Sequence, residues 1–319
     1  MAVRSEDVAR RAGVSRATVS QILNGRDARF SDRTREKVRD AARELGYEPS
    51  VAGRALARGS SDVVIALIPN TTFGGNLQDV FERLTDVLAA QGLTLVLRLS
   101  VPSTESLGRL VAGMKPAAVF SLTPLGEPER TLLAERDVPV IDPVTVPGAD
   151  HDHVIGALQA RTLIEHGHTH LAFAHLRDVR QDPFGDGRER GVRDVCREEG
   201  LADPVVVRLG IDLDDAATVL DALGPPGVAV ACYNDDVAMT LLAAARRRGL
   251  RVPEDLALIG MDHTPLSAVS DPPLTTITMD LSAAADAATI SLLTRLGRPV
   301  DGVAKASPPR PVVVTGGTV

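Results

Sequence analysis

The sequence predicts an α/β protein in which a small all-α head precedes a body of two doubly wound parallel-sheet lobes. Two observations lead to this prediction. Three helical patterns fit within the first 48 residues, whereas from Asp62 onward short β-rich runs alternate with helical stretches. Strands that alternate with helices indicate βαβ units and parallel sheets. The predicted domains are 1–48 for the head, 49–60 for a connecting segment and 61–319 for the body.

The composition excludes several protein classes. Of 319 residues, 44% are apolar and 24% are charged, which fits neither a disordered nor a collagen-like chain. The longest apolar runs, such as Val63–Ile68 and Val228–Cys232, are much shorter than the ~20 residues of a membrane-spanning helix. The first residues carry charges throughout and lack the apolar segment of a secretory signal. We therefore expect a cytoplasmic protein with no membrane partner.

Charge is divided unevenly along the chain. Residues 1–60 contain 13 basic and 8 acidic residues, a net charge of +5, and the remaining residues contain 22 and 34, a net charge of −12. A basic head on an acidic body favours a polyanion as the partner of the head. An arginine-rich, solvated helix face is the alternative explanation, and charge alone does not separate the two.

Three short helices are predicted in the head. The first spans Ser5–Ala12, with Ser5 as its N-cap and Gly13 as its end. The second, Arg16–Leu23, follows a capping Ser15, and the third, 32–45, follows a capping Ser31. Apolar residues at helical spacing predict a shared core; they are Val8, Ala9, Ala12, Val14, Val19, Ile22, Leu23, Val38, Ala41, Ala42 and Leu45.

The first two helices have the spacing of a helix-turn-helix, because a three-residue turn with Gly13 joins them. In this motif the second helix enters the DNA major groove by its N-terminal end. Arg16 can pair with guanine and Gln21 with adenine, and Ala17 can contact a thymine methyl group. The other predicted DNA contacts, mainly to phosphates, are Ser15, Thr18, Ser20 and Asn24. A helical bundle without a DNA role is the alternative.

Eight strands are predicted in the body, and this number suits two lobes better than one sheet. The strands are 63–68, 93–99, 117–121, 138–142, 171–174, 205–208, 228–231 and 256–261. Helical stretches such as 76–91 and 235–248 separate them. A closed eightfold barrel is the alternative architecture.

Motifs for catalysis, cofactors and metals are weak. The histidines in 151–153 and 166–170 have neither cysteine companions nor an HExxH pattern. The glycine-rich stretch 185–191 has one residue too many for a dinucleotide fingerprint, and no phosphate-binding loop or GxSxG motif occurs. Cys196 and Cys232 fit buried core positions. We expect no enzymatic activity, no cofactor and no metal site.

Three blocks of the head, 6–24, 34–38 and 45–49, resemble the DNA-binding head of the lactose-repressor/galactose-repressor family of bacterial transcription regulators. The resemblance implies that the segment after residue 48 is a hinge that becomes helical on DNA, with Leu56 as a minor-groove wedge and Arg54 as a further DNA contact. This chain departs from the family by Ser50 and Gly53, where Asn and Ala are usual. Because Gly costs ~1 kcal/mol relative to Ala in a helix, we expect the hinge to depend strongly on DNA for its order.

The resemblance extends over the body and implies the two-lobed fold of type I periplasmic binding proteins. The matching stretches are 167–168, 234–235, 249–255, 259–262 and 272–277. The implied first lobe contains about 61–166 and 279–300, and the second contains about 167–278 and 301–319. Small molecules bind in such folds where the carboxyl ends of the strands of both lobes face each other.

The same resemblance implies an effector site. Arg188 matches an arginine that contacts effectors, and Asn234, Asp235 and Asp262 follow strand ends. Arginine offers a fixed fork of donors, while Asp and Asn can bind vicinal hydroxyls. A surface arginine, a helix cap at Asn234 and a turn residue at Asp262 are the alternatives. In the first lobe Asn70 and Phe73 are candidate contacts, and Asp152 is a further candidate.

We therefore expect a ligand-responsive transcription regulator, a repressor that binds a palindromic DNA operator as a homodimer. A small sugar-like or nucleoside-like effector would control it. Residues 307–319 lack apolar heptads, so no tetramer is expected. The alternative is an α/β enzyme that processes sugars or nucleosides and carries an accessory DNA-binding head.

Overall fold

The computed structural model describes residues 3–23, 27–47, 60–69, 75–99, 103–142, 150–178, 182–224, 226–300 and 310–319. The chain divides into two compact units, one of Met1–Val63 with Gly108–Ala117 and one of Val64–Leu107 with Ala118–Val319. The predicted contacts Asn24, Arg54, Leu56, Asn70 and Phe73 lie outside the described residues. So does the predicted hinge, apart from Ser60.

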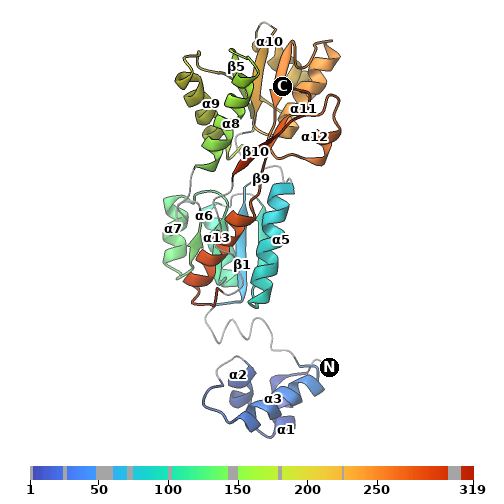
Figure 1. Cartoon of the computed structure of the whole chain (residues 1–319). Helices are drawn as coiled ribbons and strands as arrows, with labels where there is room; N and C mark the ends of the chain where they lie inside the picture. Colours follow the sequence, from blue (N-terminus) through green and yellow to red (C-terminus); the bar gives the residue numbers. More distant parts are fainter. Residues whose placement is uncertain are drawn as a thin grey trace. The chain divides into compact units, whose positions relative to one another are not determined.

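The head contains three helices, α1 (Ser5–Ala12), α2 (Arg16–Leu23) and α3 (Asp32–Glu44) (Figure 1). The prediction for α1 and α2 is confirmed, and α3 ends one residue before the predicted Leu45. The predicted N-cap of α1 was wrong. Ser5 is already helical and Arg4 is the cap residue, because the Arg4 backbone N–H donates to the Asp7 carboxylate at 2.9 Å.

Side-chain caps and a shared core hold the three helices together. The Thr18 N–H donates to Ser15 Oγ at 3.1 Å, and the Thr34 N–H donates to Ser31 Oγ at 3.3 Å. Each cap of this kind contributes ~1 kcal/mol. The buried core consists of Val8, Ala9, Ala12, Val19, Ile22, Val38, Ala41 and Ala42. As predicted, α2 therefore turns its apolar side inward and leaves its polar side outside.

The first lobe is built on a four-stranded sheet of β1 (Val63–Ile68), β2 (Thr94–Leu99), β3 (Ala118–Ser121) and β4 (Val140–Ile141), in the order β2-β1-β3-β4. β3 runs parallel to β1 and to β4. The helices of this part of the chain are α5 (Gly75–Ala90), α6 (Thr104–Met114), α7 (Glu127–Ala134) and α13 (Ser282–Arg295). Helix α13, from near the C-terminus, packs beside α5 (Figure 1), and Arg83 of α5 donates to Asp286 of α13 at 2.7 and 2.9 Å.

The second lobe repeats this plan with β5 (Leu171–Leu176), β6 (Val205–Leu209), β7 (Val228–Cys232) and β8 (Leu256–Ile259), all parallel in the order β6-β5-β7-β8. Phe173 packs toward α8 (His151–Glu165) and α9 (Gly185–Glu198), whereas its neighbours Ala172 and Ala174 pack toward α10 (Leu213–Ala222) and α11 (Asp235–Arg247). Helices thus cover both faces of the sheet, which confirms the predicted doubly wound fold.

Two strands were not predicted. β9 (Thr276–Met279) pairs antiparallel with β10 (Pro311–Val314), and the short helix α12 (Pro265–Val269) precedes them. The stretch 311–314 begins with proline and has no alternation of polar and apolar residues. Its partner lies more than 30 residues away, so no hairpin turn marks the pair.

Candidate functional site

The outer side of α2 presents the side chains that the sequence nominated for DNA contact. Arg16, Ala17 and Ser20 are exposed, and Thr18 and Gln21 are half-buried. Two of the longer side chains, Arg16 and Gln21, have charged or polar partners within the head. A guanidinium nitrogen of Arg16 lies 3.4 Å from a Glu6 carboxylate oxygen, and Arg29 Nη2 donates to Gln21 Oε1.

The contact with Arg29 changes what Gln21 can offer to a base. A paired contact with adenine needs both the oxygen and the NH₂ group of the carboxamide. While Oε1 accepts from Arg29, only the NH₂ group of Gln21 is free of that bond, and it can donate to an acceptor on a base edge. The Arg29 guanidinium also lies 5.0 Å from the centre of the Phe30 ring. Sequence reasoning missed Arg29, although an Arg-Phe pair beside a recognition helix was a possible signal.

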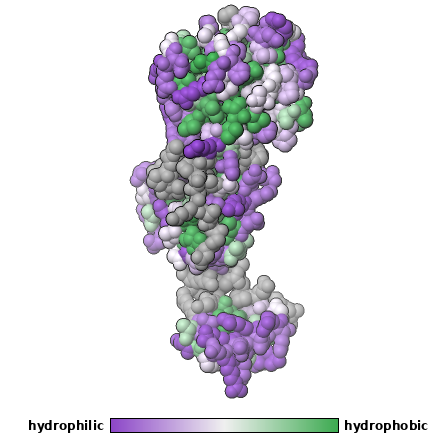
Figure 2. Space-filling view, in the orientation of Figure 1, coloured by the Kyte–Doolittle hydropathy of each residue, from purple (hydrophilic) through white to green (hydrophobic). Residues whose placement is uncertain are grey.

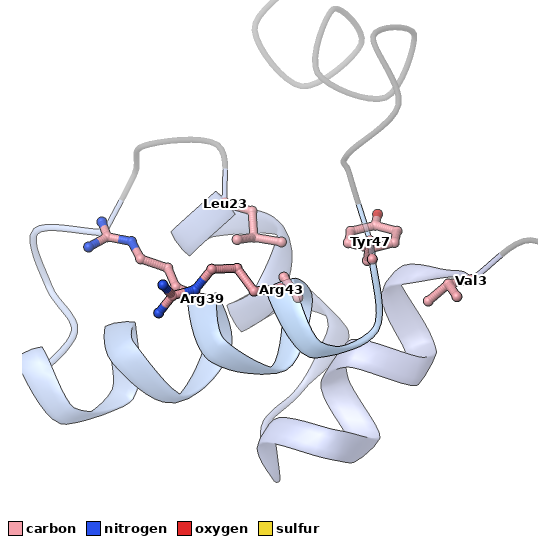
Figure 3. A pocket seen from close by; sticks show the side chains of 7 residues that line it. Val3, Leu23, Arg39, Arg43 and Tyr47 are labelled. Carbon is pink, nitrogen blue, oxygen red and sulfur yellow. The ribbon is translucent and has the colours of Figure 1, made fainter.

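The remaining surface of the head is rich in arginine. The face shown in Figure 2 is largely hydrophilic, and arginines such as Arg10, Arg11 and Arg43 form exposed ion pairs with Asp7, Glu44 and Asp40. Exposed pairs contribute only ~0–1 kcal/mol, so phosphates can replace the carboxylates at little cost. A groove of about 1020 Å³ also opens on the head (Figure 3) and is lined by Val3, Leu23, Arg39, Ala42, Arg43, Gly46 and Tyr47.

In the second lobe, Arg188 at the end of the first turn of α9 is almost completely buried. Its Nε donates to Asp152 Oδ1 of α8 at 3.1 Å, and its Nη1 donates to the Tyr233 carbonyl oxygen at 2.5 Å. The guanidinium carbon lies 4.9 Å from the centre of the Tyr233 ring and 5.8 Å from that of Phe184. These contacts fix the direction of the guanidinium fork.

Charge and burial oppose each other around Arg188. Burial disfavours the charged guanidinium, yet the nearby carboxylates of Asp152 and Asp262 keep the pKa of Arg188 above its ordinary value. Burial raises the pKa of Asp152, and the Arg188 charge only partly offsets this. The buried Arg188 cation is therefore in contact with one acidic group, Asp152, and under the electrostatic influence of a second, Asp262.

Two glycines allow the helices that carry this pair to approach closely. A Cβ atom on Gly156 of α8 would lie 1.9 Å from the Arg188 carbonyl oxygen, and one on Gly191 of α9 would lie 2.1 Å from the His153 carbonyl oxygen. Both distances are far inside van der Waals contact, so no larger residue fits at either position. Backbone packing of α8 on α9 thus sets the spacing between Asp152 and Arg188.

Asn234 and Asp235 serve the structure of the lobe. Asn234 Oδ1 caps α11 by accepting from the Val237 N–H at 3.0 Å, which agrees with the helix-cap alternative. Asp235 is fully buried, and its carboxylate accepts from Thr276 Oγ1 at 2.5 Å and from the Thr264 N–H at 2.7 Å. Both oxygens therefore have hydrogen-bond partners inside the lobe, and the expected ligand contact of Asp235 stays a prediction.

Asp262 is half-buried and follows β8 in an unusual conformation. Its φ is 104°, in the region that favours glycine, while its backbone N–H donates to the Ile277 carbonyl oxygen at 2.9 Å. Strain of this kind persists where the surrounding structure enforces it, and it is frequent at binding sites. Asp262 is close enough to Arg188 to affect its pKa.

At the carboxyl end of the first-lobe sheet, Asp142 is buried directly after β4. Its Oδ2 accepts from the Leu125 N–H at 3.1 Å and from Arg130 Nη2. A cavity of about 40 Å³ is lined by Leu67, Pro69, Ser121, Thr123, Pro124, Leu125, Gly126 and Glu129. Sequence reasoning did not nominate Asp142, although its position at the end of a predicted strand was the same signal that nominated Asp262.

Within the described part of the chain, no three His, Cys, Asp or Glu side chains are grouped so that they could hold a metal ion. Cys196 and Cys232 are both buried, and burial raises the pKa of each thiol, so neither is an activated nucleophile. Among the same residues, no helix has the length and apolarity needed to cross a membrane.

Comparison with protein families identifies both parts of the chain. Residues 6–50 match the family of bacterial regulatory proteins named after lacI, and residues 160–319 match a periplasmic binding protein-like domain. The HTH-type transcriptional regulator MalR of Streptomyces coelicolor is 32% identical over 93% of this chain and 91% of its own length. The HTH-type transcriptional repressor CytR of Escherichia coli is 29% identical over 86% of this chain and 84% of its own.

Solved structures show the same fold. The lac repressor dimer bound to operator and the anti-inducer ONPF superposes with a TM-score of 0.77 at 22% identity, covering 100% of this chain and 99% of that one. The transcriptional regulator CelR in complex with cellobiose gives a TM-score of 0.66 at 24% identity, with both chains fully covered.

Proposed function

Because the chain belongs to the lacI family of bacterial regulatory proteins, which are DNA-binding transcription regulators, we propose that it represses transcription from a palindromic operator under the control of a small effector held around Arg188. The head supplies DNA binding through α2, with Arg16, Ala17 and Gln21 as base contacts and Ser15, Thr18, Ser20 and Asn24 as further contacts. The second lobe supplies the effector site through Arg188, Asp152 and Asp262.

The observation that carries the effector proposal is the fixed guanidinium of Arg188, which donates to Asp152 and whose pKa is also raised by the charge of Asp262. A donor fork beside two acceptors is complementary to neighbouring hydroxyl groups, which both donate and accept. The same acidic pair disfavours phosphates and carboxylates, because like charges repel in a buried site. We therefore favour an uncharged sugar or nucleoside, and the cellobiose in the CelR structure is a ligand of that kind.

We further propose that the protein acts as a homodimer. The short helix α12 of the second lobe leaves two large apolar side chains exposed three residues apart, with 66% of Leu266 and 76% of Val269 accessible. Clusters of exposed apolar side chains commonly mark protein interfaces. A two-fold dimer places two recognition helices on the two halves of a palindrome.

Catalysis is not part of the proposal. The lacI family is a family of regulators. In the second lobe, the carboxylate of Asp235 is hydrogen-bonded inside the fold, and that of Asp152 is paired with Arg188. The enzyme alternative would require a nucleophile or an acid–base pair in the cleft, and the two cysteines do not supply the nucleophile because both are buried. We place the protein in the cytoplasm, where a regulator has access to its operator.

The effector site is tested by a thermal-shift screen of sugars, nucleosides and amino acids, followed by calorimetry on each compound that stabilises the protein. A compound at 100 times its dissociation constant stabilises by ~2.7 kcal/mol. Arg188→Ala and Asp262→Ala should each weaken binding by ~1–3 kcal/mol, since hydroxyls of the ligand lose their partners. Arg190→Ala is the matched control, because Arg190 is an exposed neighbour on α9 that pairs with Asp150 at 2.7 Å. Unchanged affinity in both test variants would refute the assignment.

A further inference from the structure

His175 near the end of β5 is a buried histidine that faces a carboxylate at each ring nitrogen. Its exposure is 0%. Nδ1 lies 2.5 Å from Asp182 Oδ2, and Nε2 lies 3.0 Å from Glu189 Oε2. The ring also packs edge-on against Phe173, with the ring centres 4.6 Å apart. Neither DNA contact nor the Arg188 pair accounts for this arrangement.

The two contacts can be compared with the donors that each form of the ring offers. A neutral imidazole has one donor and one acceptor, so one of the two carboxylates would face a lone pair. An imidazolium donates to both carboxylates. The charged form is therefore the one that can donate at both ring nitrogens, while Asp182 Oδ1 is buried and has no hydrogen-bond partner among the described residues in either form.

Arginine side chains also contact the carboxylates around the ring. Arg208 of β6 reaches Asp182 Oδ2 at 3.4 Å. Arg193 of α9 lies 2.5 Å from Glu189 Oε1 and 2.6 Å from Asp203. Arg197 of α9 lies 3.4 Å from Asp203 as well. Arginines thus face the carboxylates of Asp182, Glu189 and Asp203, and the case for a charged ring rests on its two direct contacts.

This cluster holds the start of the helix that carries Arg188. Glu189 is the neighbour of Arg188 on α9, and Asp182 lies in the segment that leads into α9. A Cβ atom on Gly185 would lie 2.0 Å from Asp182 Oδ1 and 2.5 Å from His175 Nδ1, so the first turn rests directly on the pair. The N-cap residue of α9, Phe184, makes no side-chain cap bond. The bonds of His175 thus join β5 to α9 where a cap is lacking.

We propose that His175, as an imidazolium, is a positioning residue of the effector site: it holds the first turns of α9 against β5 and thereby directs the Arg188 fork. This inference rests on the proposed role of Arg188 in effector binding. It does not depend on which effector is bound.

Three substitutions separate positioning by charge from simple packing. His175→Gln removes the charge and cannot donate to both carboxylates. Glu189→Gln lets a neutral imidazole keep both bonds, because the new carboxamide can donate to Nε2 and still accept from Arg193. His170→Gln is the matched control, since His170 is exposed next to the start of the same strand.

The readout is NMR of the full-length protein without ligand, using ¹⁵N-labelled histidine and arginine side chains, together with amide exchange over α9. In the wild type at neutral pH both ring nitrogens of His175 should carry protons, and the Arg188 Nε–H should give a protected signal. In Glu189→Gln one ring nitrogen should lose its proton while the Arg188 signal and α9 protection persist. In His175→Gln the first turns of α9 should exchange at least about tenfold faster, since bonds to charged groups are lost, and the Arg188 signal should lose its protection.

A neutral His175 ring in the wild type would overturn the proposal. So would unchanged α9 exchange and an unchanged Arg188 signal in His175→Gln, or an effect of equal size in His170→Gln. If His175→Gln does not fold, the ring states of the wild type and Glu189→Gln still decide the question. Normal compound binding by Arg188→Ala, with the predicted ring state intact, would instead refute the proposed effector site and leave the bonding of α9 as described.

Discussion

The Nε of Arg188 donates to Oδ1 of Asp152 at 3.1 Å and so joins the first turns of α9 and α8. The Arg188 side chain of this pair is 7% exposed and the Asp152 side chain 29%. Removal of one partner from a buried pair leaves the other charge without compensation. The pair therefore links the stability of the second lobe to its proposed ligand site.

We expect Asp152→Ala to lower the free energy of unfolding by about 1–3 kcal/mol, since it leaves the Arg188 charge buried with one bond fewer. Glu198→Ala is the control, because Glu198 of α9 pairs with Arg161 of α8 at 3.1 Å on the surface of the same two helices. Loss of an exposed pair of this kind should lower the free energy of unfolding by no more than ~1 kcal/mol. Urea unfolding measures the free energy of unfolding of both variants. Equal decreases in Asp152→Ala and Glu198→Ala would show that burial of the Arg188 pair has no special effect.

Asp235 should give the lobe a characteristic pH dependence. Burial raises its pKa, and the hydrogen bonds from Thr276 and Thr264 only partly offset this. A carboxyl group with a higher pKa in the folded than in the unfolded state binds protons more tightly when folded. Its stabilising effect is thus complete in acid and is lost as the pH rises through the raised folded value.

Asp235→Asn removes this titration but keeps an oxygen for the Thr264 N–H and an NH₂ group for the Thr276 hydroxyl. The wild type should therefore lose unfolding free energy relative to Asp235→Asn as the pH rises from about 4, near the ordinary aspartate value. Asp235→Ala should be less stable than either protein, since the Thr264 N–H and the Thr276 hydroxyl lose their acceptor at ~1–3 kcal/mol each. If the difference in unfolding free energy between the wild type and Asp235→Asn stays constant across this pH range, the account is contradicted.

Local signals made most of the fold predictable. Ser15 and Ser31 mark the starts of two head helices, and Gly13, with a φ of 68°, ends the first. Short apolar runs located all eight strands of the two parallel sheets. The sequence did not predict β9 and β10, because their pairing joins residues far apart in the chain. It did not predict Arg4 as the cap residue of α1, because the side chain that makes the capping bond belongs to Asp7.

The site was predictable only in part, because strand-end position does not say where a side chain points. Asp262 and Asp235 both follow strands, yet the charge of Asp262 raises the pKa of Arg188, while Asp235 is hydrogen-bonded inside the lobe. The pairing of Asp152 with Arg188 depends on the close approach of two helices at Gly156, which no local pattern reports.

The contact between Arg29 and Gln21 leads to a prediction about DNA specificity. Arg29→Ala frees Gln21 Oε1, so base preference at the operator position read by Gln21 should change toward adenine. The position is the one at which Gln21→Ala loses its base preference. Anisotropy titrations of the wild type and Arg29→Ala with operators that carry each of the four base pairs there measure the change. Arg10→Ala on α1 is the control and should weaken all four operators equally. An unaltered preference in Arg29→Ala would show that the contact does not restrict Gln21.

The hinge prediction concerns residues outside the described part of the chain. If 49–60 becomes helical only on DNA, Gly53→Ala should tighten operator binding, since alanine favours the helix by roughly 1 kcal/mol. Leu56→Ala should weaken specific binding and reduce DNA bending, because a minor-groove wedge would be lost. Anisotropy and a circular-permutation bending assay test both variants, and an unaltered affinity and bend in Leu56→Ala would exclude the wedge.

Sequence-specific DNA binding by the head is tested most directly by the affinity of the full-length protein for its own promoter region, measured by anisotropy as the salt concentration is varied. Arginine contacts to phosphates release counterions, so the logarithm of the binding constant should fall linearly with the logarithm of salt concentration. The promoter fragment should also bind on the order of 10³-fold more tightly than a scrambled duplex of equal length. A slope near zero, or equal affinity for both duplexes, would contradict the account.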